Sequence, residues 1–576
     1  MVASAARHPE RTFLRFIDPA SPEAPPRSFT FAAFRDGAGR AAGALRAAGV
    51  TAGDRVLLLA ENSPDWQLVA LGTQLLRAEP AALFSSLSAD QVQAIAGRVS
   101  PRALVVSSAK QWAKLAPVAG ALAAAGLRLV ASAEPLQGVP ETVRTVALDA
   151  LTGPDAPALP VAELEALAAA VGQEDPYLLL FTSGTTGRPK GVRVPQRAIV
   201  HAIDGGNLAV GTTDQDLGLH FLPFAHVAGH DQFALAVAQG HGLVMVARRE
   251  DIERAMGFGP TYLFSVPLVY DRIRMAVEAR LESLPAPLRA LARRALEGAA
   301  RVRVDGAGTV ADRLLARLAD RLVGRAVRQR LGGRVKGLFS GGAPASPGLF
   351  RFFESLGIPY VELYGMSETA GLISSNLFTG PRRAASAGLI TPDHEVRFAP
   401  DGELWLRGPL LFSGYLDAAD DEAAFTPDGF FRTGDLGRID DEGLLRIEGR
   451  KKHLMVLSTG KKLSPEPIEQ AIASAAPFEG AVLLGEGKPF VAAAVFVARE
   501  ELERLAASGQ DAAEALLARA RGALREFSEY EKPKRLVVIA GSPQDHPALV
   551  TPTLKLKRDA LLASIGPKVA AIYGAV

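Results

Sequence analysis

The sequence predicts an α/β protein: a large N-terminal domain of layered, mostly parallel sheets with helices plus a β-rich subdomain, followed by a small α+β C-terminal domain. Three observations support this fold class. Helix-like and strand-like patterns alternate over residues 1–150, as in proteins built on parallel sheets. Short strands separated by hairpin turns begin near residue 395. A separate α+β pattern covers about 452–576, and the 576-residue length leaves room for several domains.

The N-terminal elements alternate in a regular order. Residues 31–48 place apolar side chains at helical spacing, and Gly49 ends this predicted helix. The apolar run 55–60 predicts a buried strand, 66–76 a second helix and 102–107 a second strand. This repetition of strand, helix and strand indicates a parallel sheet covered by helices.

The middle of the chain, residues 272–334, predicts an amphipathic helical insertion with a solvated basic face. It is rich in Leu, Ala and Arg, and residues 312–331 carry apolar side chains at i, i+3, i+4 and i+7. A helix that binds a membrane surface or a nucleic acid is the alternative. Asp312 and Asp320 interrupt the basic face and weaken that alternative, although weak peripheral membrane association stays open.

Hairpins follow the insertion. Asp401 and Gly402 stand between two short strand patterns, and Glu442 and Gly443 repeat the arrangement. Antiparallel strands therefore form the predicted β-rich subdomain.

The composition excludes several classes of protein. Lys and Arg number 64 against 62 Asp and Glu, a net charge of +2, which disfavours a protein that wraps nucleic acid. The absence of cysteine excludes disulfide scaffolds, thiolate metal sites and cysteine nucleophiles, and it fits a cytoplasmic protein. We find no signal peptide at the N-terminus and no apolar window long enough to span a membrane.

The strongest chemical motif is LLLFTSGTTGRPKGV at 178–192. A buried strand ends in a loop whose glycines let backbone N–H groups approach an anion, while hydroxyl groups and Lys190 add donors and charge. These properties suit a polyphosphate, but the spacing differs from the common P-loop. A flexible Ser/Thr/Gly connector is the alternative, and the ordered Pro-Lys-Gly ending disfavours it.

This motif closely resembles the signature of the adenylate-forming superfamily, which includes acyl-CoA synthetases, nonribosomal adenylation domains and luciferase. Further resemblances follow in the family's order: SGGAP at 340–344, YGMSET at 364–369, FRTGDL at 431–436, GRKK at 449–452 and TPTLKLKR at 551–558. The match effectively spans the chain and looks most like long-chain fatty acyl-CoA synthetases. It implies a large domain of residues 1–449, a hinge at 450–452 and a mobile cap of residues 453–576.

The resemblance implies a reaction in which a carboxylate attacks the α-phosphate of ATP, pyrophosphate leaves, and the acyl group passes from the adenylate to coenzyme A. Glu368 is then the expected Mg²⁺ ligand, and Lys555, Glu368, Ser367 and Thr182 are the expected catalytic residues. The residues implied to bind ATP or AMP are Thr182, Ser183, Gly184, Thr185, Thr186, Gly187, Lys190, Gly341, Gly342, Ala343, Pro344, Tyr364, Gly365, Met366, Ser367, Asp435, Arg450 and Lys555.

The C-terminal motif contains two lysines. We favour Lys555 over Lys557 as the catalytic lysine, on the register of TLKLKR against the family pattern, although Leu554 replaces the usual glycine. The resemblance also makes Lys452 the hinge residue and the Gly460 loop the part of the cap that meets the thiol acceptor.

His226 stands where the family has a residue of the acyl pocket wall, and where amino-acid-activating relatives keep an aspartate. This disfavours an amino-acid substrate. His226 and His230 are also spaced as a metal pair, but a core or wall histidine is the favoured interpretation.

We therefore expect an ATP-dependent ligase that joins a medium- to long-chain fatty acid to coenzyme A, with no nucleic-acid partner. The alternatives are loading of an acyl-carrier protein, activation of an aryl or unusual acid, and a catalytically inactive nucleotide-binding homologue. A homodimer is also open.

Overall fold

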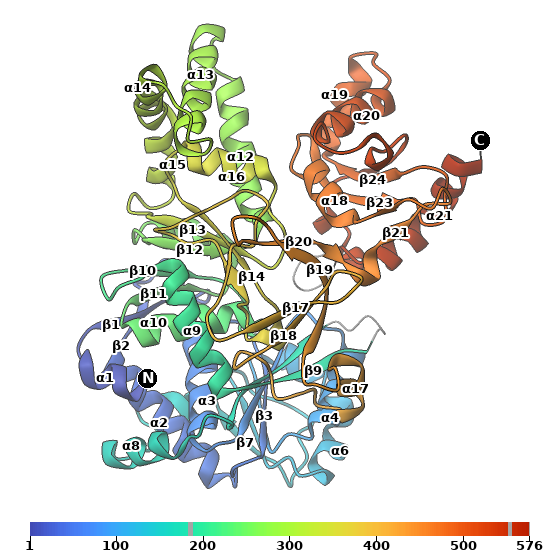
Figure 1. The fold of residues 1–576 in the computed structure, drawn as a ribbon. Helices are drawn as coiled ribbons and strands as arrows, with labels where there is room; N and C mark the ends of the chain where they lie inside the picture. Colours follow the sequence, from blue (N-terminus) through green and yellow to red (C-terminus); the bar gives the residue numbers. More distant parts are fainter. Residues whose placement is uncertain (183–187, 551–555, 575–576) are drawn as a thin grey trace.

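A computed structural model describes residues 1–182, 188–550 and 556–574 (Figure 1). The predicted loop residues Ser183, Gly184, Thr185, Thr186 and Gly187, and also Lys555, lie outside the described residues. The structure confirms the predicted fold class: mixed α/β with parallel sheets and a smaller C-terminal part.

A seven-stranded sheet forms the base of the molecule, in the order β7-β6-β5-β3-β4-β8-β9. Its strands are parallel except β9, which returns antiparallel to β8. The strands are β3 Arg55–Leu59, β4 Glu79–Leu83, β5 Ala103–Val106, β6 Leu129–Ser132, β7 Arg144–Ala147, β8 Pro176–Thr182 and β9 Lys190–Pro195.

A nine-stranded sheet lies beside it, in the order β16-β15-β14-β13-β12-β10-β11-β1-β2. The central strands from β14 to β1 are parallel, and the edge strands are antiparallel. The strands are β1 Thr12–Ile17, β2 Arg27–Thr30, β10 Leu217–His220, β11 Gly242–Val246, β12 Tyr262–Ser265, β13 Gly337–Gly341, β14 Tyr360–Tyr364, β15 Ser374–Ser375 and β16 Leu389–Ile390.

Helices cover both faces of each sheet. The layer between the sheets holds α1 Val2–Arg7, α2 Phe31–Ala47, α3 Pro64–Leu75, α7 Asp149–Thr152, α8 Val161–Ala170, α9 Gln196–Val210 and α10 Val227–Gln239. The outer face of the first sheet holds α4 Ala89–Val99, α5 Ala109–Ala113 and α6 Ala119–Ala124. The outer face of the second holds α11 Ile252–Met256, α12 Pro267–Glu282, α15 Arg325–Arg330 and α16 Pro347–Ser355.

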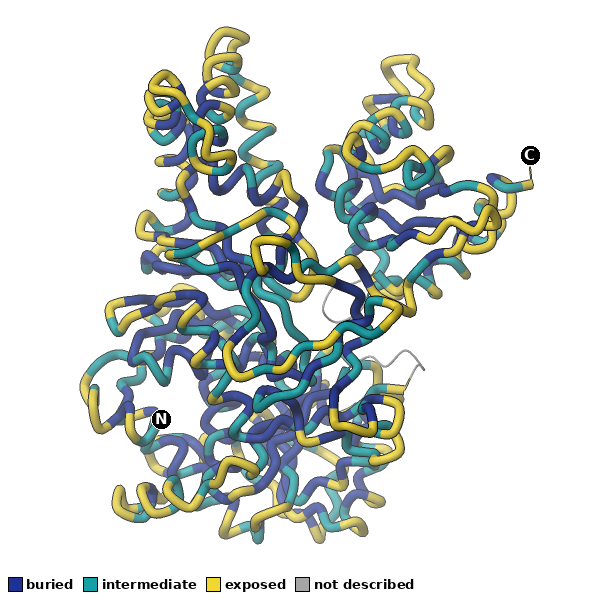
Figure 2. Tube along the Cα trace, in the orientation of Figure 1, coloured by how far each residue is buried: buried dark blue, intermediate teal, exposed yellow. Residues whose placement is uncertain are grey.

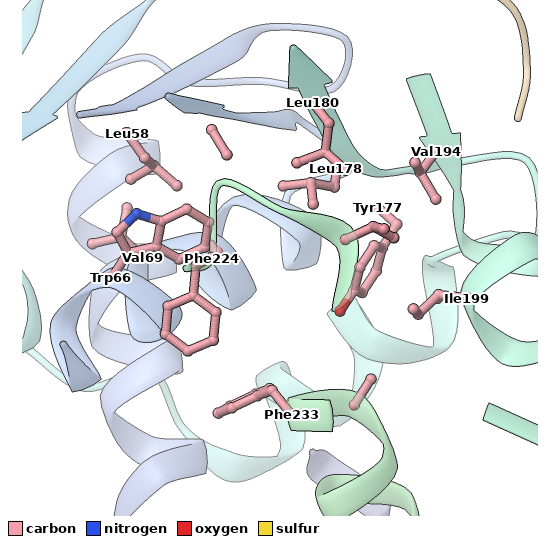
Figure 3. Close-up of a cluster of buried hydrophobic side chains, with 14 of the residues drawn as sticks. Leu58, Trp66, Val69, Tyr177, Leu178, Leu180, Val194, Ile199, Phe224 and Phe233 are labelled. Atoms are coloured by element: carbon pink, nitrogen blue, oxygen red, sulfur yellow. The ribbon is translucent and has the colours of Figure 1, made fainter. Parts of the chain in front are cut away.

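The main core lies between the two sheets. Successive side chains of a strand point to opposite faces of the sheet, so each strand supplies this core with every second residue. In β3, Val56 and Leu58 face the middle helices, whereas Leu57 and Leu59 face the outer helices. Trp66 stacks on Phe224 with ring centroids 5.2 Å apart, and both side chains are fully buried (Figure 3). Figure 2 shows this buried interior and the exposed outer helices and loops.

The predicted insertion is helical, as expected. Helices α12, α13 Ala286–Arg303, α14 Val310–Ala319 and α15 rise above the nine-stranded sheet (Figure 1). A π-helical segment, residues 320–324, joins α14 to α15. Small buried side chains, Ala295, Ala299, Ala316 and Ala319, let α13 and α14 approach closely.

Both predicted hairpins form one antiparallel sheet, β17-β18-β19-β20. Gly402 lies between β17 and β18, and Gly443 lies between β19 and β20; both have positive φ, as the turns require. The strands are β17 Glu395–Phe398, β18 Glu403–Arg407, β19 Phe431–Ile439 and β20 Leu445–Arg450, with the short helix α17 Asp421–Ala424 between β18 and β19.

The C-terminal part has its own sheets and its own core. A two-stranded sheet pairs β21 Met455–Val456 with β22 Lys462–Leu463, and a three-stranded sheet has the order β23-β24-β25. The remaining elements are β23 Phe478–Leu484, β24 Ala492–Val497, β25 Leu536–Ala540, α18 Pro465–Ala473, α19 Arg499–Ala507, α20 Ala512–Ala523 and α21 Arg558–Gly574.

A polar contact joins the C-terminal part to helix α12. The carboxylate of Asp271 accepts hydrogen bonds from Ser474 Oγ at 3.0 Å, from Gln470 Nε2 at 3.2 Å and from Arg274 at 3.1 Å. Asp271 is only 3% exposed, and Arg274 also donates to the backbone carbonyl of Ser474. We call these four residues the interdomain cluster.

Candidate functional site

The predicted site residues come from three different sheets that meet at one place. Thr182 and Lys190 are paired opposite each other at the end of the β8–β9 hairpin. Tyr364 ends β14 in the nine-stranded sheet, and Asp435 lies on β19 of the antiparallel sheet. A side-chain hydrogen bond between Tyr364 and Asp435 connects the latter two sheets, and the backbone of residues 412–416 connects this region to β9.

Asp435 is the centre of the first group of contacts. Asp435 is 3% exposed. Its Oδ2 accepts a hydrogen bond from Tyr364 Oη at 2.6 Å, and its Oδ1 lies 2.8 Å from Arg450 Nε. The β19–β20 register places Asp435 directly opposite Arg450. Because a carboxylate has about four lone-pair sites, this group can still accept hydrogen bonds from two further hydroxyls, as a ribose would offer.

The SGGAP segment lies next to Tyr364. Strand β13 pairs with β14 so that Gly341 is opposite Leu363, and the following residues Gly342, Ala343 and Pro344 leave the sheet at the same edge. Gly342 has φ +80°, a conformation that favours glycine.

The side chain of Glu362 binds the backbone that follows the SGGAP segment. Its Oε1 accepts a hydrogen bond from the backbone N–H of Ala345 at 3.1 Å, whereas its buried Oε2 has no partner in the described residues. Burial raises the pKa of the Glu362 carboxyl to about 8. Glu362 was not among the residues singled out from the sequence.

The turn after β14 is tightly built. A Cβ on residue 365 would lie 2.2 Å from the carbonyl oxygen of Gly371, so only glycine fits at Gly365. Met366 donates its backbone N–H to Thr369 Oγ1 at 3.1 Å, and residues 367–369 form one 3-10 turn that carries Ser367 and Glu368.

Glu368 and Lys190 meet at Tyr415. Tyr415 Oη donates to Glu368 Oε1 at 3.0 Å, and Lys190 Nζ lies 4.6 Å from the centre of the Tyr415 ring and 3.1 Å from Asp420 Oδ1. Sequence reasoning missed Tyr415 and Asp420, because no local pattern marks them. The position of Tyr415 depends on the segment 412–416, which runs beside β9 and bonds to the backbone of Glu368 through Phe412 N–H at 2.9 Å.

The donor set suits Mg²⁺. Burial raises the pKa of the Glu368 carboxyl, and Glu368 forms no ion pair within the described part of the chain. The described residues contain no cluster of three metal-ligating side chains. The one carboxylate of Glu368 fits Mg²⁺, which commonly takes one or two protein carboxylates and completes its shell with phosphate oxygens and water.

An apolar cavity adjoins this turn. It lies between the middle helices and the nine-stranded sheet, and Gly371 and Leu372, which follow the 367–369 turn, form one wall. The other lining residues are Ala202, Ile203, Gly206, Val210, Asp231, Gln232, Leu235, Tyr262, Phe264, Phe339 and Leu363.

His226 is not among the lining residues of this cavity. It caps helix α10, where its Nδ1 accepts a hydrogen bond from Ala228 N–H at 3.2 Å. His230 is fully buried, with Nε2 2.7 Å from the carbonyl oxygen of Phe224, and burial lowers its pKa to about 3. His230 is thus a core histidine, and the acyl-wall role of His226 stays a prediction.

The remaining predicted residues lie in or next to the C-terminal part. Lys452 is exposed in the 3-10 turn 451–453 directly after β20, and Gly460, with φ +79°, lies in the exposed turn between β21 and β22. Lys557 Nζ donates to the carbonyl of Ala548 at 3.4 Å, next to Arg558, which pairs with Glu469. The choice of Lys555 over Lys557 stays a prediction.

Comparison with known proteins gives consistent matches. The model of the family described as AMP-binding enzyme matches residues 1–416, and that of the AMP-binding enzyme C-terminal domain matches residues 452–576. A relative from Mycobacterium bovis, long-chain-fatty-acid–CoA ligase FadD15, is 32% identical over 91% of this chain and 89% of its own. The Rattus norvegicus long-chain-fatty-acid–CoA ligase ACSBG1 is 28% identical over 76% of this chain and 62% of its own.

Solved structures agree on the fold. The adenylation domain of the carboxylate reductase from Mycobacterium chelonae has a TM-score of 0.76 at 21% identity and covers 98% of this chain and 89% of that one. The anthranilate CoA ligase AuaEII in complex with anthranoyl-AMP has a TM-score of 0.73 at 18% identity, and the match covers 98% of this chain and 96% of that one.

Proposed function

Because this chain belongs to the family of AMP-binding enzymes, we propose that it activates a fatty acid with ATP through an acyl-adenylate and then transfers the acyl group to coenzyme A. One observation carries the proposal: the segment 364–372 contributes Tyr364 and Glu368 to the polar site and Gly371 and Leu372 to the wall of the apolar cavity. We assign this apolar cavity to the acyl chain, and its common wall with the polar nucleotide site suits the joining of a fatty carboxylate to ATP.

The first half-reaction needs cations and donors around the α-phosphate. A carboxylate oxygen of the fatty acid bonds to the α-phosphorus, and the bond to the pyrophosphate oxygen breaks. Lys190 at the hairpin end and the hydroxyls of Thr182 and Ser367 are the groups assigned to the phosphates. Mg²⁺ held by Glu368 would offset phosphate charge when bound. Asp435 and Arg450 hold the ribose, and Tyr364 stacks on the adenine.

The second half-reaction is assigned to a movement of the C-terminal part. In this proposal residues 1–449 form the large domain, 450–452 the hinge and 453–576 the cap, with Lys452 as the pivot. The cap delivers Lys555 for adenylation and afterwards turns the Gly460 loop toward the thiol of coenzyme A. Lys451, beside the pivot, is anchored to the large domain by Asp401 Oδ2 at 2.6 Å and Glu403 Oε2 at 2.9 Å.

The assay is pyrophosphate release with ATP, Mg²⁺ and a panel of fatty acids of different chain length. We expect release with at least one medium- or long-chain acid and formation of its coenzyme A thioester. A panel that gives no pyrophosphate would refute the proposal and favour a homologue that only binds nucleotide. A phosphopantetheinylated carrier protein in place of coenzyme A tests the other acceptor, and aryl acids test the other substrate class.

Two matched variants test the lysine assignment. Lys555→Ala should abolish adenylation but spare thioester formation from supplied acyl-adenylate, because only the first half-reaction needs this charge. Lys557→Ala is the control and should retain both half-reactions. If the selective loss appears in Lys557→Ala, the register is wrong by two residues.

No helix among residues 1–182, 188–550 and 556–574 is long and apolar enough to cross a membrane. The cytoplasmic location, the oligomeric state and weak peripheral membrane association stay predictions.

A further inference from the structure

One side chain in the apolar cavity does not match a plain hydrocarbon ligand. Three of the described lining residues carry polar side chains, and two of these side chains have hydrogen-bond partners. Gln232 donates to the carbonyl of Leu219 at 2.9 Å and lies 3.0 Å from His220 Nδ1, and Tyr262 Oη lies 2.7 Å from His241 Nε2. The third is Asp231, whose Oδ1 is buried without a hydrogen-bond partner among the described residues.

The surroundings of Asp231 favour its neutral form. Burial raises the pKa of the Asp231 carboxyl well above its ordinary value, and the ion pairs of the described chain do not include it. Apart from Gln232 and Tyr262, the other described side chains that line the cavity are Ala, Ile, Leu, Val and Phe. A protonated carboxyl has one O–H donor and a carbonyl oxygen that accepts, so it can either donate a hydrogen bond to a hydroxyl or accept one from it.

The Asp231 carboxyl packs closely against Gly371. A Cβ on residue 371 would lie 1.9 Å from Asp231 Oδ2, and Gly371 has φ +92°, so glycine leaves the room that this carboxyl occupies. Gly371 follows Glu368 by three residues. Asp231 therefore lies against the segment that carries Glu368.

We propose that Asp231 is a specificity-determining residue that hydrogen-bonds to a hydroxyl group near the carboxyl end of the acyl chain, so that hydroxylated fatty acids, such as 3-hydroxy acids, are the preferred substrates. This inference rests on the proposed function. A plain alkyl chain would leave the buried Oδ1 of Asp231 without a hydrogen-bond partner among the described residues, whereas a chain hydroxyl satisfies it.

The experiment compares matched pairs of acids that differ only in a 3-hydroxyl, at the chain length with the fastest pyrophosphate release. The readout is the ratio of kcat/KM for the hydroxylated acid to that for the plain acid. We expect this ratio to exceed one in the wild type. It should fall about tenfold in Asp231→Leu, because the loss of one hydrogen bond changes an equilibrium constant by about this factor. A hydroxyl at the far end of the chain should not give this preference.

Two further variants make the test specific. Asp231→Asn keeps a donor and an acceptor and should retain most of the preference; it also serves if the leucine variant folds poorly. Leu235→Val changes another wall of the same cavity and neither removes nor adds a polar atom. It should change kcat/KM by the same factor for the hydroxylated and the plain acid. An equal ratio in the wild type and Asp231→Leu would overturn the inference and leave a buried water as the partner of Asp231. Loss of pyrophosphate release with every acid would instead refute the proposed function.

Discussion

Glu362 makes the stability of the protein depend on pH in a direction that can be measured. Burial raises the pKa of this carboxyl from 4.5 to about 8, so the folded state favours its protonated form. The contribution of protonated Glu362 to the free energy of unfolding is fully present below pH 4.5 and is lost as the pH rises through 8. At about 1.4 kcal/mol per pKa unit, the loss between pH 5 and pH 9 is about 4 kcal/mol.

Glu362→Gln removes this titration and keeps an oxygen that can accept the Ala345 N–H. Thermal melting of both proteins from pH 5 to pH 9 should give a difference in melting temperature, variant minus wild type, that grows with pH. For a domain of this size about 4 kcal/mol corresponds to about 4 °C.

Glu23→Gln, at an exposed loop position, is the control and should leave the pH profile of melting unchanged. Parallel melting profiles for Glu362→Gln and the wild type would refute the reasoning, because they would mean that Glu362 ionises as easily in the folded protein as in the unfolded chain.

Three further substitutions test other contacts. Tyr364→Phe removes the donor to Asp435 and should raise the KM for ATP about tenfold in the pyrophosphate assay, whereas an unchanged KM would contradict the ribose assignment. Tyr415→Phe removes the hydroxyl that stabilises ionised Glu368; the Mg²⁺ concentration for half-maximal rate should rise, more at pH 6 than at pH 8, and an equal rise at both would count against this role. Ser474→Ala weakens the interdomain cluster and should increase tryptic cleavage at 450–452 several-fold in limited proteolysis; equal cleavage would mean that the contact is dispensable.

Local pattern was sufficient for most of the fold. The run 55–60 is mostly apolar because helices cover both faces of strand β3, and this apolar run is what predicts a buried strand. Gly402 and Gly443 indicate hairpins because their turns need positive φ. The long Leu, Ala and Arg stretch predicts helices but not their division, since the π-helical segment at 320–324 has no sequence marker.

The site could be predicted only where a motif carries it. Asp435 and Arg450 lie in separate motifs, and their pairing follows from the β19–β20 register. The contact between Tyr415 and Glu368 joins residues 47 positions apart. The buried Oδ1 of Asp231, which has no partner among the described residues, becomes notable only because this residue lines a cavity. Such features depend on tertiary packing, which periodicity and turn chemistry do not encode.

The convergence of three sheets has a thermodynamic consequence. Lys190, Tyr364 and Asp435 belong to separate sheets, so a nucleotide held by all three binds only while those sheets stay together. Its binding free energy, about 2.7 kcal/mol at a concentration 100 times Kd, then opposes separation of any one sheet from the others. Saturating ATP should therefore merge any unfolding steps that are distinct in the free protein, and the substrate then adds to the cooperativity with which the three sheets unfold.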